Sequence, residues 1–261
     1  MNAGYCCLTA VPVRAESSHR SEMVSQLLFG EVYHVLDMTS EWVKIVACSD
    51  GYEGWIQRKQ HFAISEEDLD NYLKCEKLRL KTALLPGQPT ILTMGALIPV
   101  HPNCSPYPEV LPEQISEDDW LPVADLTKLS PKDCMGLIWN AAASMKGVPY
   151  LWGGRTPLGI DCSGFTQLLY SLIGVQLPRD ASQQVQEGEP LDFINEAKFG
   201  DLAFFHNEVG RIVHVGLMLN DHEIIHASGS VRVDSVDENG IFNADLQRYT
   251  HSLRVVKRIV C

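Results

Sequence analysis

The sequence predicts an α+β protein in which one or two small all-β barrels precede a domain made of a helix packed on an antiparallel sheet. Three observations predict this class. The first 64 residues are short β-rich runs between turns, residues 161–174 have helical apolar spacing, and strand patterns return from residue 201 onward. We therefore expect an all-β barrel at 1–64, a linker helix and a second barrel at 65–129, and the α+β domain at 130–261.

The first barrel is expected to contain five short strands. Turn residues, among them Gly30 and Asp50-Gly51, separate runs rich in β-branched and aromatic residues at 5–13, 23–28, 31–37, 42–47 and 54–56. Ser65, followed by three acidic residues, predicts a capped helix at the boundary. The runs at 78–84, 90–94, 96–101 and 120–123 then predict a second, less regular barrel.

The formal net charge of −12 limits the classes of partner that the chain can bind. An acidic balance repels nucleic acid and anionic membranes, and it favours a substrate that carries an amine. No run of 18 apolar residues predicts a membrane span. The first 20 residues lack the basic region of a signal peptide, so we expect a cytoplasmic protein, with the periplasm as the alternative if a leader peptide has been removed. The oligomeric state stays open.

The eight cysteines have no paired C-x-x-C spacing. This pattern argues against a zinc site and is typical of free thiols in a reducing compartment. We expect no metal and no other cofactor.

Cys162 has the sequence setting of a nucleophile. Asp161 can cap a helix whose apolar residues recur with helical spacing until Gly174 ends it, so Cys162 falls in the first turn. Unpaired amide N–H groups and the positive end of the helix dipole favour a thiolate there, so we expect the pKa of Cys162 to be lowered. Glycines at 153, 154, 159 and 164 permit close approach to the sulfur.

Five short motifs in order carry a family resemblance. Tyr150-x-Trp-Gly-Gly, Asp-Cys162-Ser-Gly-Phe, Gly-Asp201-Leu, His214-Val-Gly and Ile-His226-Ala resemble the NlpC-type cysteine peptidases over about residues 131–261. The resemblance implies a papain-like arrangement for this domain. Residues 12–14, 42–45 and 51–56 resemble the bacterial Src-homology-3-like barrels that often precede such domains.

The two histidines constrain the hairpin between their strands. Strand side chains alternate, so His214 and His226 share a face only if the connecting loop has an odd number of residues. We expect a loop of three or five residues centred near Asn220 or Asp221. Gly216 and Met218 would then lie on the face of His214. Ile224 and Ser228 would lie on the face of His226, and Leu217, Leu219 and Ile225 on the opposite one.

The resemblance implies the catalytic roles. Cys162 is the nucleophile, His214 its base and His226 the residue that orients His214, while the Cys162 amide and the Tyr150 hydroxyl stabilise the oxyanion. Taken singly, a histidine in an apolar strand is more often structural. His206 is the rival base. The six other histidines are expected at the surface or in turns: 19, 34, 61, 101, 222 and 251.

The resemblance also implies a substrate. Enzymes of this type with preceding barrels resemble the γ-D-glutamyl-L-diamino acid peptidases of bacterial cell-wall peptides, in which the first barrel closes one end of the cleft. Such an enzyme accepts peptides with a free N-terminal L-alanine and releases L-Ala-D-Glu. Asp180 matches the residue that pairs with the ammonium group, and Glu22 and Tyr52 match more loosely. The candidates that remain for substrate binding are Arg179 and Ser163, for the glutamyl carboxylate, and Asp161.

Two other classes of function stay open. An amidase or acyltransferase on the same fold would need Cys162 and His214 but not Asp180 or Glu22. A non-catalytic protein that binds the cell wall would use the barrels alone. For Arg179 and Asp180 the alternative is a surface ion pair.

Overall fold

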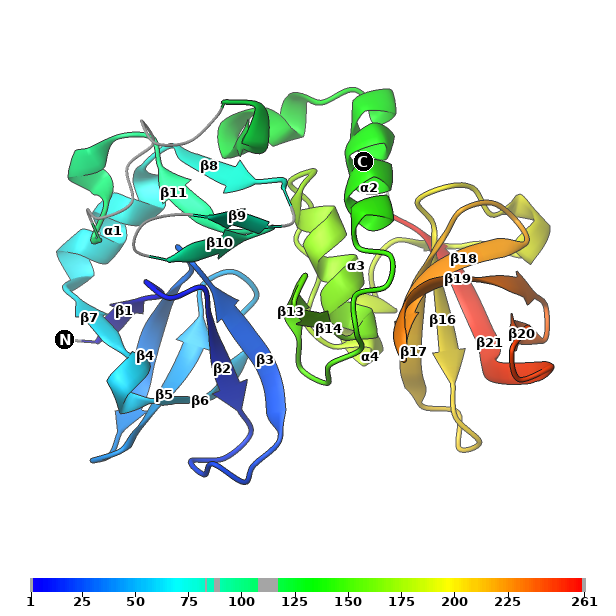
Figure 1. Cartoon of the computed structure of the whole chain (residues 1–261), viewed down its shortest axis with the longest axis horizontal. Helices are drawn as coiled ribbons and strands as arrows, with labels where there is room; N and C mark the ends of the chain where they lie inside the picture. The colour runs from blue at the N-terminus through cyan, green and yellow to red at the C-terminus, as the bar shows by residue number, and fades with distance from the viewer. Residues whose placement is uncertain (1, 83, 87–89, 108–116, 260–261) are drawn as a thin grey trace. The chain divides into compact units, whose positions relative to one another are not determined.

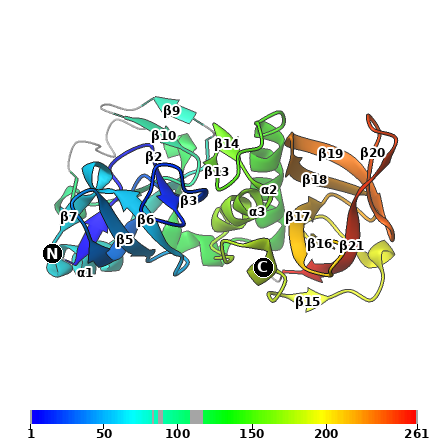
Figure 2. The same ribbon diagram turned by 90° about the horizontal axis from the view of Figure 1, so that it is seen from below.

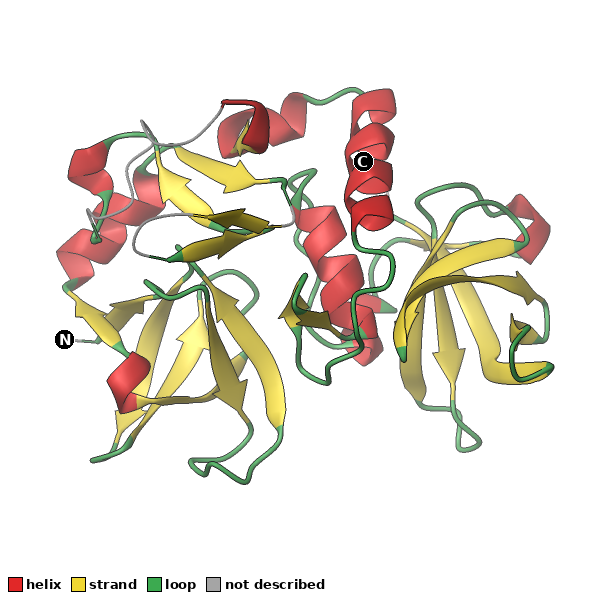
Figure 3. Cartoon of the chain, viewed as in Figure 1, coloured by secondary structure: helices red, strands yellow, loops and turns green. Residues whose placement is uncertain are grey.

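The computed structural model describes residues 2–82, 84–86, 90–107 and 117–259, and the chain forms two compact units. One comprises Met1–Lys128 together with Trp152–Pro157, and the other comprises Leu129–Leu151 and Leu158–Cys261. Both are built mainly of strands (Figure 3). Within the described ranges, no helix is long and apolar enough to cross a membrane.

The first unit contains a strongly curved seven-stranded antiparallel sheet (Figure 1). Its order is β3-β2-β6-β5-β4-β1-β7, and the strands are β1 (Ala3–Tyr5), β2 (Ala10–Arg14), β3 (Met23–Leu28), β4 (Val32–Met38), β5 (Trp42–Ala47), β6 (Glu53–Gln57) and β7 (Phe62–Ile64). Apolar side chains that alternate along the strands fill its interior, including Val11, Val13, Val43 and Ile45. The expected strand at 5–13 is two strands, because residues 6–9 leave the sheet.

Gly30 shows why the turn before β4 requires glycine. Its φ is +85°, and a Cβ at this position would lie 1.9 Å from the carbonyl oxygen of Leu97. Any larger residue would therefore clash with the backbone of another element of the same unit.

The segment after the barrel begins with helix α1 (Glu66–Lys74), which Ser65 and Asp68 cap reciprocally as expected. Strands β8 (Lys77–Leu80), β11 (Leu97–Pro99) and β12 (Trp120–Pro122) form one sheet, and β9 (Leu84–Pro86) pairs with β10 (Ile91–Thr93). Tyr72, Leu92 and Ile98 share one buried cluster with Tyr5 of the barrel. A second closed barrel stays a prediction, and residues 83, 87–89 and 108–116 of this segment lie outside the described residues.

A disulfide joins Cys75, at the end of α1, to Cys104, at the end of the 3-10 helix Pro102–Cys104. The expectation of free thiols is wrong for this pair. The fold brings together two cysteines separated by 29 positions, which no local spacing signals. Since disulfides persist in oxidising compartments, the cysteines no longer favour a cytoplasmic location.

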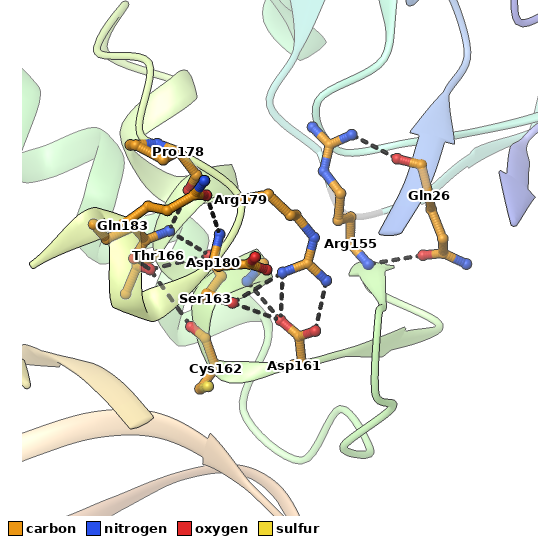
Figure 4. Close-up of polar contacts among 12 residues, drawn as sticks. Gln26, Arg155, Asp161, Cys162, Ser163, Thr166, Pro178, Arg179, Asp180 and Gln183 are labelled. Carbon is orange, nitrogen blue, oxygen red and sulfur yellow. Dashed lines mark hydrogen bonds and ion pairs between the residues drawn. The ribbon is translucent and has the colours of Figure 1, made fainter. Parts of the chain in front are cut away.

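Arg155 is buried in the first unit, although it comes from the glycine-rich segment before Cys162. Its guanidinium donates to both carboxylate oxygens of Glu31, at 2.8 and 2.9 Å, and its backbone N–H donates to the Gln26 side chain at 2.7 Å. Figure 4 shows the contacts between Gln26 and Arg155. This buried pair holds the segment Trp152–Pro157 in the first unit.

The second unit is the expected α+β domain. Its sheet has the order β15-β21-β16-β17-β18-β19-β20. Strand β21 also pairs with β20, so the strands from β21 to β20 form a closed ring (Figure 2). Helix α3 packs on β17 and β18, and α2 packs on α3. The helices are α2 (Pro131–Ser144), α3 (Cys162–Ser171) and α4 (Ala181–Gln184); the strands are β13 (Arg155–Thr156, placed in the first unit), β14 (Gly159–Ile160), β15 (Glu189–Pro190), β16 (Leu202–His206), β17 (Ile212–Met218), β18 (Glu223–Ser228), β19 (Ser230–Asp237), β20 (Gly240–Asn243) and β21 (Arg248–Arg258).

The motif at Gly200-Asp201 has a structural explanation. Asp201 is buried and accepts hydrogen bonds from the Arg258 guanidinium and from the Lys198 amide, and the Tyr170 hydroxyl of α3 donates to the Gly200 carbonyl. These bonds connect the start of β16 to β21 and to the helix that carries Cys162.

Candidate active site

Cys162 is the first residue of α3, and Asp161 caps this helix as expected. The Asp161 carboxylate accepts a hydrogen bond of 2.7 Å from the Gly164 amide. Cys162 is 6% exposed, and the backbone N–H of Val215 in β17 interacts with its sulfur. Packing of α3 on β17 thus brings the thiol to the residue that follows His214.

The expected lowering of the Cys162 pKa is wrong. Burial raises the pKa of this thiol to about 11, and the negative charge of Asp161 raises it further. The amides of Val215 and Ser163 and the charge of Arg179 act in the opposite direction but do not compensate. The expectation considered only the helix terminus, whereas tertiary packing removes water from the sulfur and places a carboxylate beside it.

Asp161 and Arg179 form a buried ion pair, not a surface pair (Figure 4). Arg179 is 1% exposed, and its Nη1 and Nη2 donate to the two Asp161 oxygens at 3.0 and 2.5 Å. Nη1 also donates to the Ser163 hydroxyl at 2.9 Å. The arrangement fixes the cap of the nucleophile helix. A contact of Arg179 or Ser163 with substrate stays a prediction.

The hairpin between β17 and β18 has the expected odd loop. Leu217 pairs with Ile225, Met218 pairs with Ile224, and the Leu219 amide bonds to the Glu223 carbonyl, so three residues centred on Asp221 make the turn. His214 and His226 therefore share a face. The distance between His214 Nε2 and His226 Nδ1 is 2.8 Å.

His226 has a second partner, Asp234 of β19, whose Oδ2 lies 3.1 Å from His226 Nε2. Both histidines are buried, and so is Asp234. Burial, followed by the neighbouring His226 and His251, lowers the pKa of His214 well below its ordinary value. At neutral pH His214 is therefore uncharged and able to accept a proton.

His251 was expected at the surface or in a turn, and this expectation is wrong. Its ring stacks on His214, with centroids 4.1 Å apart and planes at 27°. Burial lowers the pKa of His251 to about 4. His206, the alternative base, has a different partner. Its Nδ1 lies 2.8 Å from the carbonyl oxygen of Asn207.

Asp234 and His251 are site residues that the sequence did not predict. Residues 231–234 (Val-Arg-Val-Asp) alternate apolar and polar side chains, and this short alternation was the available signal for a further strand. The long strand β21 begins at Arg248, so that it includes His251.

Tyr150 lies in the second unit, paired by its backbone with Ile160 and Gly229. Burial raises the pKa of its hydroxyl, and the charges of Cys162 and Asp161 raise it further. The hydroxyl therefore keeps its proton and can donate to an oxyanion. This electrostatic coupling to Cys162 agrees with the expected role, which stays a prediction.

The three expected ammonium ligands lie in different elements. Asp180 is half-buried and precedes α4, where its amide donates to the Gln183 side chain at 3.3 Å. Glu22 is exposed just before β3. Tyr52 is half-buried and lines a small hollow of the first unit with Ser25, Gln26 and Asp50. Their roles in binding stay predictions.

A cysteine, a neutral histidine and a third group that orients the histidine are the components of thiol-based acyl transfer. Throughout the described ranges, no group of three or more His, Cys, Asp or Glu side chains could hold a metal ion.

Comparisons with known proteins agree with this arrangement. Residues 147–250 match the NlpC/P60 family, and residues 13–60 match the bacterial dipeptidyl-peptidase Sh3 domain. The chain is 31% identical to a gamma-D-glutamyl-L-lysine dipeptidyl-peptidase of Bacillus subtilis over 78% of this chain and 71% of that one. It is 27% identical to a protein of the same name from Bacillus cereus, over 82% and 70%.

A crystal structure of an NlpC/P60 family protein from Bacillus cereus has the same fold, with a TM-score of 0.77 at 20% identity over 98% of this chain and 99% of that one. Three observations lead to one conclusion: the match of residues 147–250 to the family, a relative with 31% identity, and the arrangement of Cys162, His214 and His226. The chain belongs to the NlpC/P60 family and is a cysteine peptidase.

Proposed function

We propose that this peptidase hydrolyses the γ-D-glutamyl-L-diamino acid bond of peptidoglycan peptides that carry a free N-terminal L-alanine. The products are L-Ala-D-Glu and a peptide or amino acid beginning with L-lysine or diaminopimelate. Such a reaction fits the recycling of cell-wall peptides.

The observation that carries this proposal is the extent of the similarity to two gamma-D-glutamyl-L-lysine dipeptidyl-peptidases. It covers 78% and 82% of this chain and so includes barrel as well as peptidase residues. The matched Sh3 domain is itself described as that of bacterial dipeptidyl-peptidases. A peptidase domain alone would support only a general endopeptidase.

The chemical steps use Cys162 and His214. The sulfur attacks the γ-carbonyl carbon of D-glutamate while the thiol proton passes to His214. The Cys162 amide and the Tyr150 hydroxyl donate to the oxyanion. The C–N bond then breaks, the leaving amine takes the proton from His214, and water hydrolyses the thioester to release L-Ala-D-Glu and restore the thiol.

Recognition of the free amine is assigned to Asp180, with Glu22 and Tyr52 as further candidates. A carboxylate paired with an ammonium group loses its partner when the alanine nitrogen is acylated, and an unpaired charge out of water is costly. Substrates attached to the sugar strand through that nitrogen should therefore be rejected. We assign Ser163, Arg179 and Asp161 to the glutamyl side of the site, where they hold the nucleophile helix in place.

The proposal is tested by incubating the full chain with L-Ala-γ-D-Glu-L-Lys, its diaminopimelate analogue and their N-acetylated forms. Mass spectrometry should detect L-Ala-D-Glu from the free peptides and at least a hundredfold less product from the acetylated ones. Cys162→Ala should yield none. Asp180→Asn should lower kcat/KM for the free peptide, whereas the exposed Glu187→Gln, which removes one charge from the same unit, should not.

The competing functions give different results. Equal rates on free and N-acetylated peptides would leave a general endopeptidase, amidase or acyltransferase. Binding to cell-wall fragments without any turnover would leave a non-catalytic binding protein.

A further inference from the structure

Asp234 ends a continuous chain of polar contacts that begins at His214. His214 Nε2 lies 2.8 Å from His226 Nδ1, and His226 Nε2 lies 3.1 Å from Asp234 Oδ2. Asp234 follows Arg232 on β19, and Arg232 pairs directly across the sheet with His226. Both side chains of the last contact are out of water, with exposed fractions of 1% for His226 and 4% for Asp234.

The ionised state of Asp234 is maintained by its other neighbours. Arg232 Nη2 donates to Asp234 Oδ1 at 2.8 Å, and Arg232 Nε lies 2.7 Å from Oδ2. Arg232 is in turn bonded to Asp245 at 2.9 Å. Burial alone would raise the pKa of Asp234, but the hydrogen bonds from His226 and Arg232 outweigh it and hold the pKa below its ordinary value.

An ionised carboxylate only accepts hydrogen bonds, and this fixes the direction of the whole chain. A neutral His226 must carry its single proton on Nε2 to donate to Asp234, which leaves a lone pair on Nδ1. That lone pair accepts from His214, so His214 carries its proton on Nε2. Nδ1 of His214 is then the unprotonated nitrogen, which is the form that a base needs.

We propose that Asp234 is a positioning residue of the peptidase, which sets the tautomers of both His226 and His214 so that Nδ1 of His214 receives the thiol proton. The inference rests on the peptidase activity of Cys162 and His214. The tautomers of His214 and His226 are properties of the free enzyme, so they can be measured without substrate. The result therefore does not depend on the proposed substrate specificity.

The other protonation pattern would make His214 inactive. If His226 carried its proton on Nδ1, it would donate to His214 Nε2, and His214 would hold its own proton on Nδ1. That nitrogen could not accept a proton from Cys162. Without Asp234, His226 can carry its proton on either ring nitrogen. Its contact with His214 does not select between the two patterns, because each ring can act as donor or acceptor.

The direct test is nuclear magnetic resonance of ¹⁵N-histidine-labelled enzyme at neutral pH. Long-range ¹H–¹⁵N correlations distinguish protonated from unprotonated ring nitrogens. We expect protons on Nε2 of both His214 and His226 and none on their Nδ1 atoms. A proton on Nδ1 of either ring in the wild-type enzyme would overturn the proposal, and this measurement needs no variant.

Asp234→Asn tests the cause. Arg232 Nη2 and Nε face the two oxygens of Asp234, and an amide has only one oxygen, so the new side chain cannot accept from Arg232 and His226 as the carboxylate does. The preference of His226 for a proton on Nε2 should then be lost, and kcat should fall by up to about 10⁴-fold with little change in KM, the size of loss that a wrong histidine tautomer causes in serine proteases.

The matched control is Asp237→Asn, on the same strand. Asp237 is partly exposed and accepts from the Tyr249 hydroxyl. This variant should keep the wild-type tautomers and a kcat within threefold of wild type. If Asp234→Asn folds, keeps both tautomers and retains kcat within threefold, Asp234 serves only the ion pair with Arg232 and the proposal is wrong.

Discussion

The imidazole of His251 stacks on that of His214 at a centroid distance of 4.1 Å, so a residue of β21 covers one face of the proposed base. The Phe205 ring packs against both imidazoles, with its centroid 5.7 Å from that of His214 and 6.1 Å from that of His251. His214 is thereby held between its bond to His226 and a planar neighbour, which restricts rotation of its ring.

His251 should weaken the fold in acid. Its pKa of about 4 lies below the ordinary 6.5, so between these values the unfolded chain binds a proton that the folded chain does not, and stability falls as pH falls. His251→Phe keeps a ring in the stack and removes the titration. Its melting temperature should therefore drop less than that of wild type between neutral pH and pH 4. The ionisable groups around His251 are His214, His226 and Asp234.

The control for this comparison is His34→Gln, at an exposed position of β4. It should show the wild-type loss of melting temperature over the same range. An equal loss in His251→Phe and wild type would mean that His251 does not titrate with a lowered pKa.

Cys162 should be a thiol in the resting enzyme. Its pKa of about 11 and the lowered pKa of His214 favour the neutral pair over a thiolate and an imidazolium. The ultraviolet absorbance of thiolate, measured as wild type minus Cys162→Ala, should be near zero at neutral pH and rise as pH approaches 11. A full thiolate signal at neutral pH would show that the ion pair forms before substrate binds.

The sequence predicted the parts of the site that depend on local rules. The helix of Cys162 and its cap at Asp161 could be predicted because the capping residue, the apolar residues and the terminating Gly174 all lie within 14 positions. The parity of the turn at Asp221 followed from the alternation of strand side chains. Both inferences need only neighbours in the chain.

What the sequence did not predict depends on distant partners. Asp234 and His251 reach His226 and His214 only because β19 pairs with β18 and because β21 lies in the same sheet, and no short-range pattern predicts these neighbours. The burial of Arg155 depends on Glu31, 124 positions away. The pKa of Cys162 was misjudged for the same reason, since burial by β17 outweighs the local effect of the helix terminus.

The disulfide between Cys75 and Cys104 should stabilise the first unit. It closes a loop with a sequence separation of 29, for which chain entropy gives about 3 to 4 kcal/mol. Reduction, or Cys75→Ser, should lower the urea midpoint accordingly, and non-reduced peptide mapping should recover the linked pair. Cys48→Ser, at a free and partly buried cysteine, is the control. Equal midpoints with and without reductant would exclude the bond in solution.

The Asp161–Arg179 pair should be far more costly to break than an exposed ion pair. Arg179→Met leaves the buried Asp161 carboxylate without its guanidinium, and removing one partner of such a pair costs about 3 to 5 kcal/mol. Adding Asp161→Asn removes the orphaned charge while keeping a side chain that caps helices equally well, so the double variant should recover part of the loss. Lys44→Met breaks the exposed pair with Glu53 and should cost at most about 1 kcal/mol. Urea unfolding of the four proteins measures all three differences. If Arg179→Met were no worse than Lys44→Met, Asp161 would have another counter-charge and the cap of the nucleophile helix would not depend on Arg179.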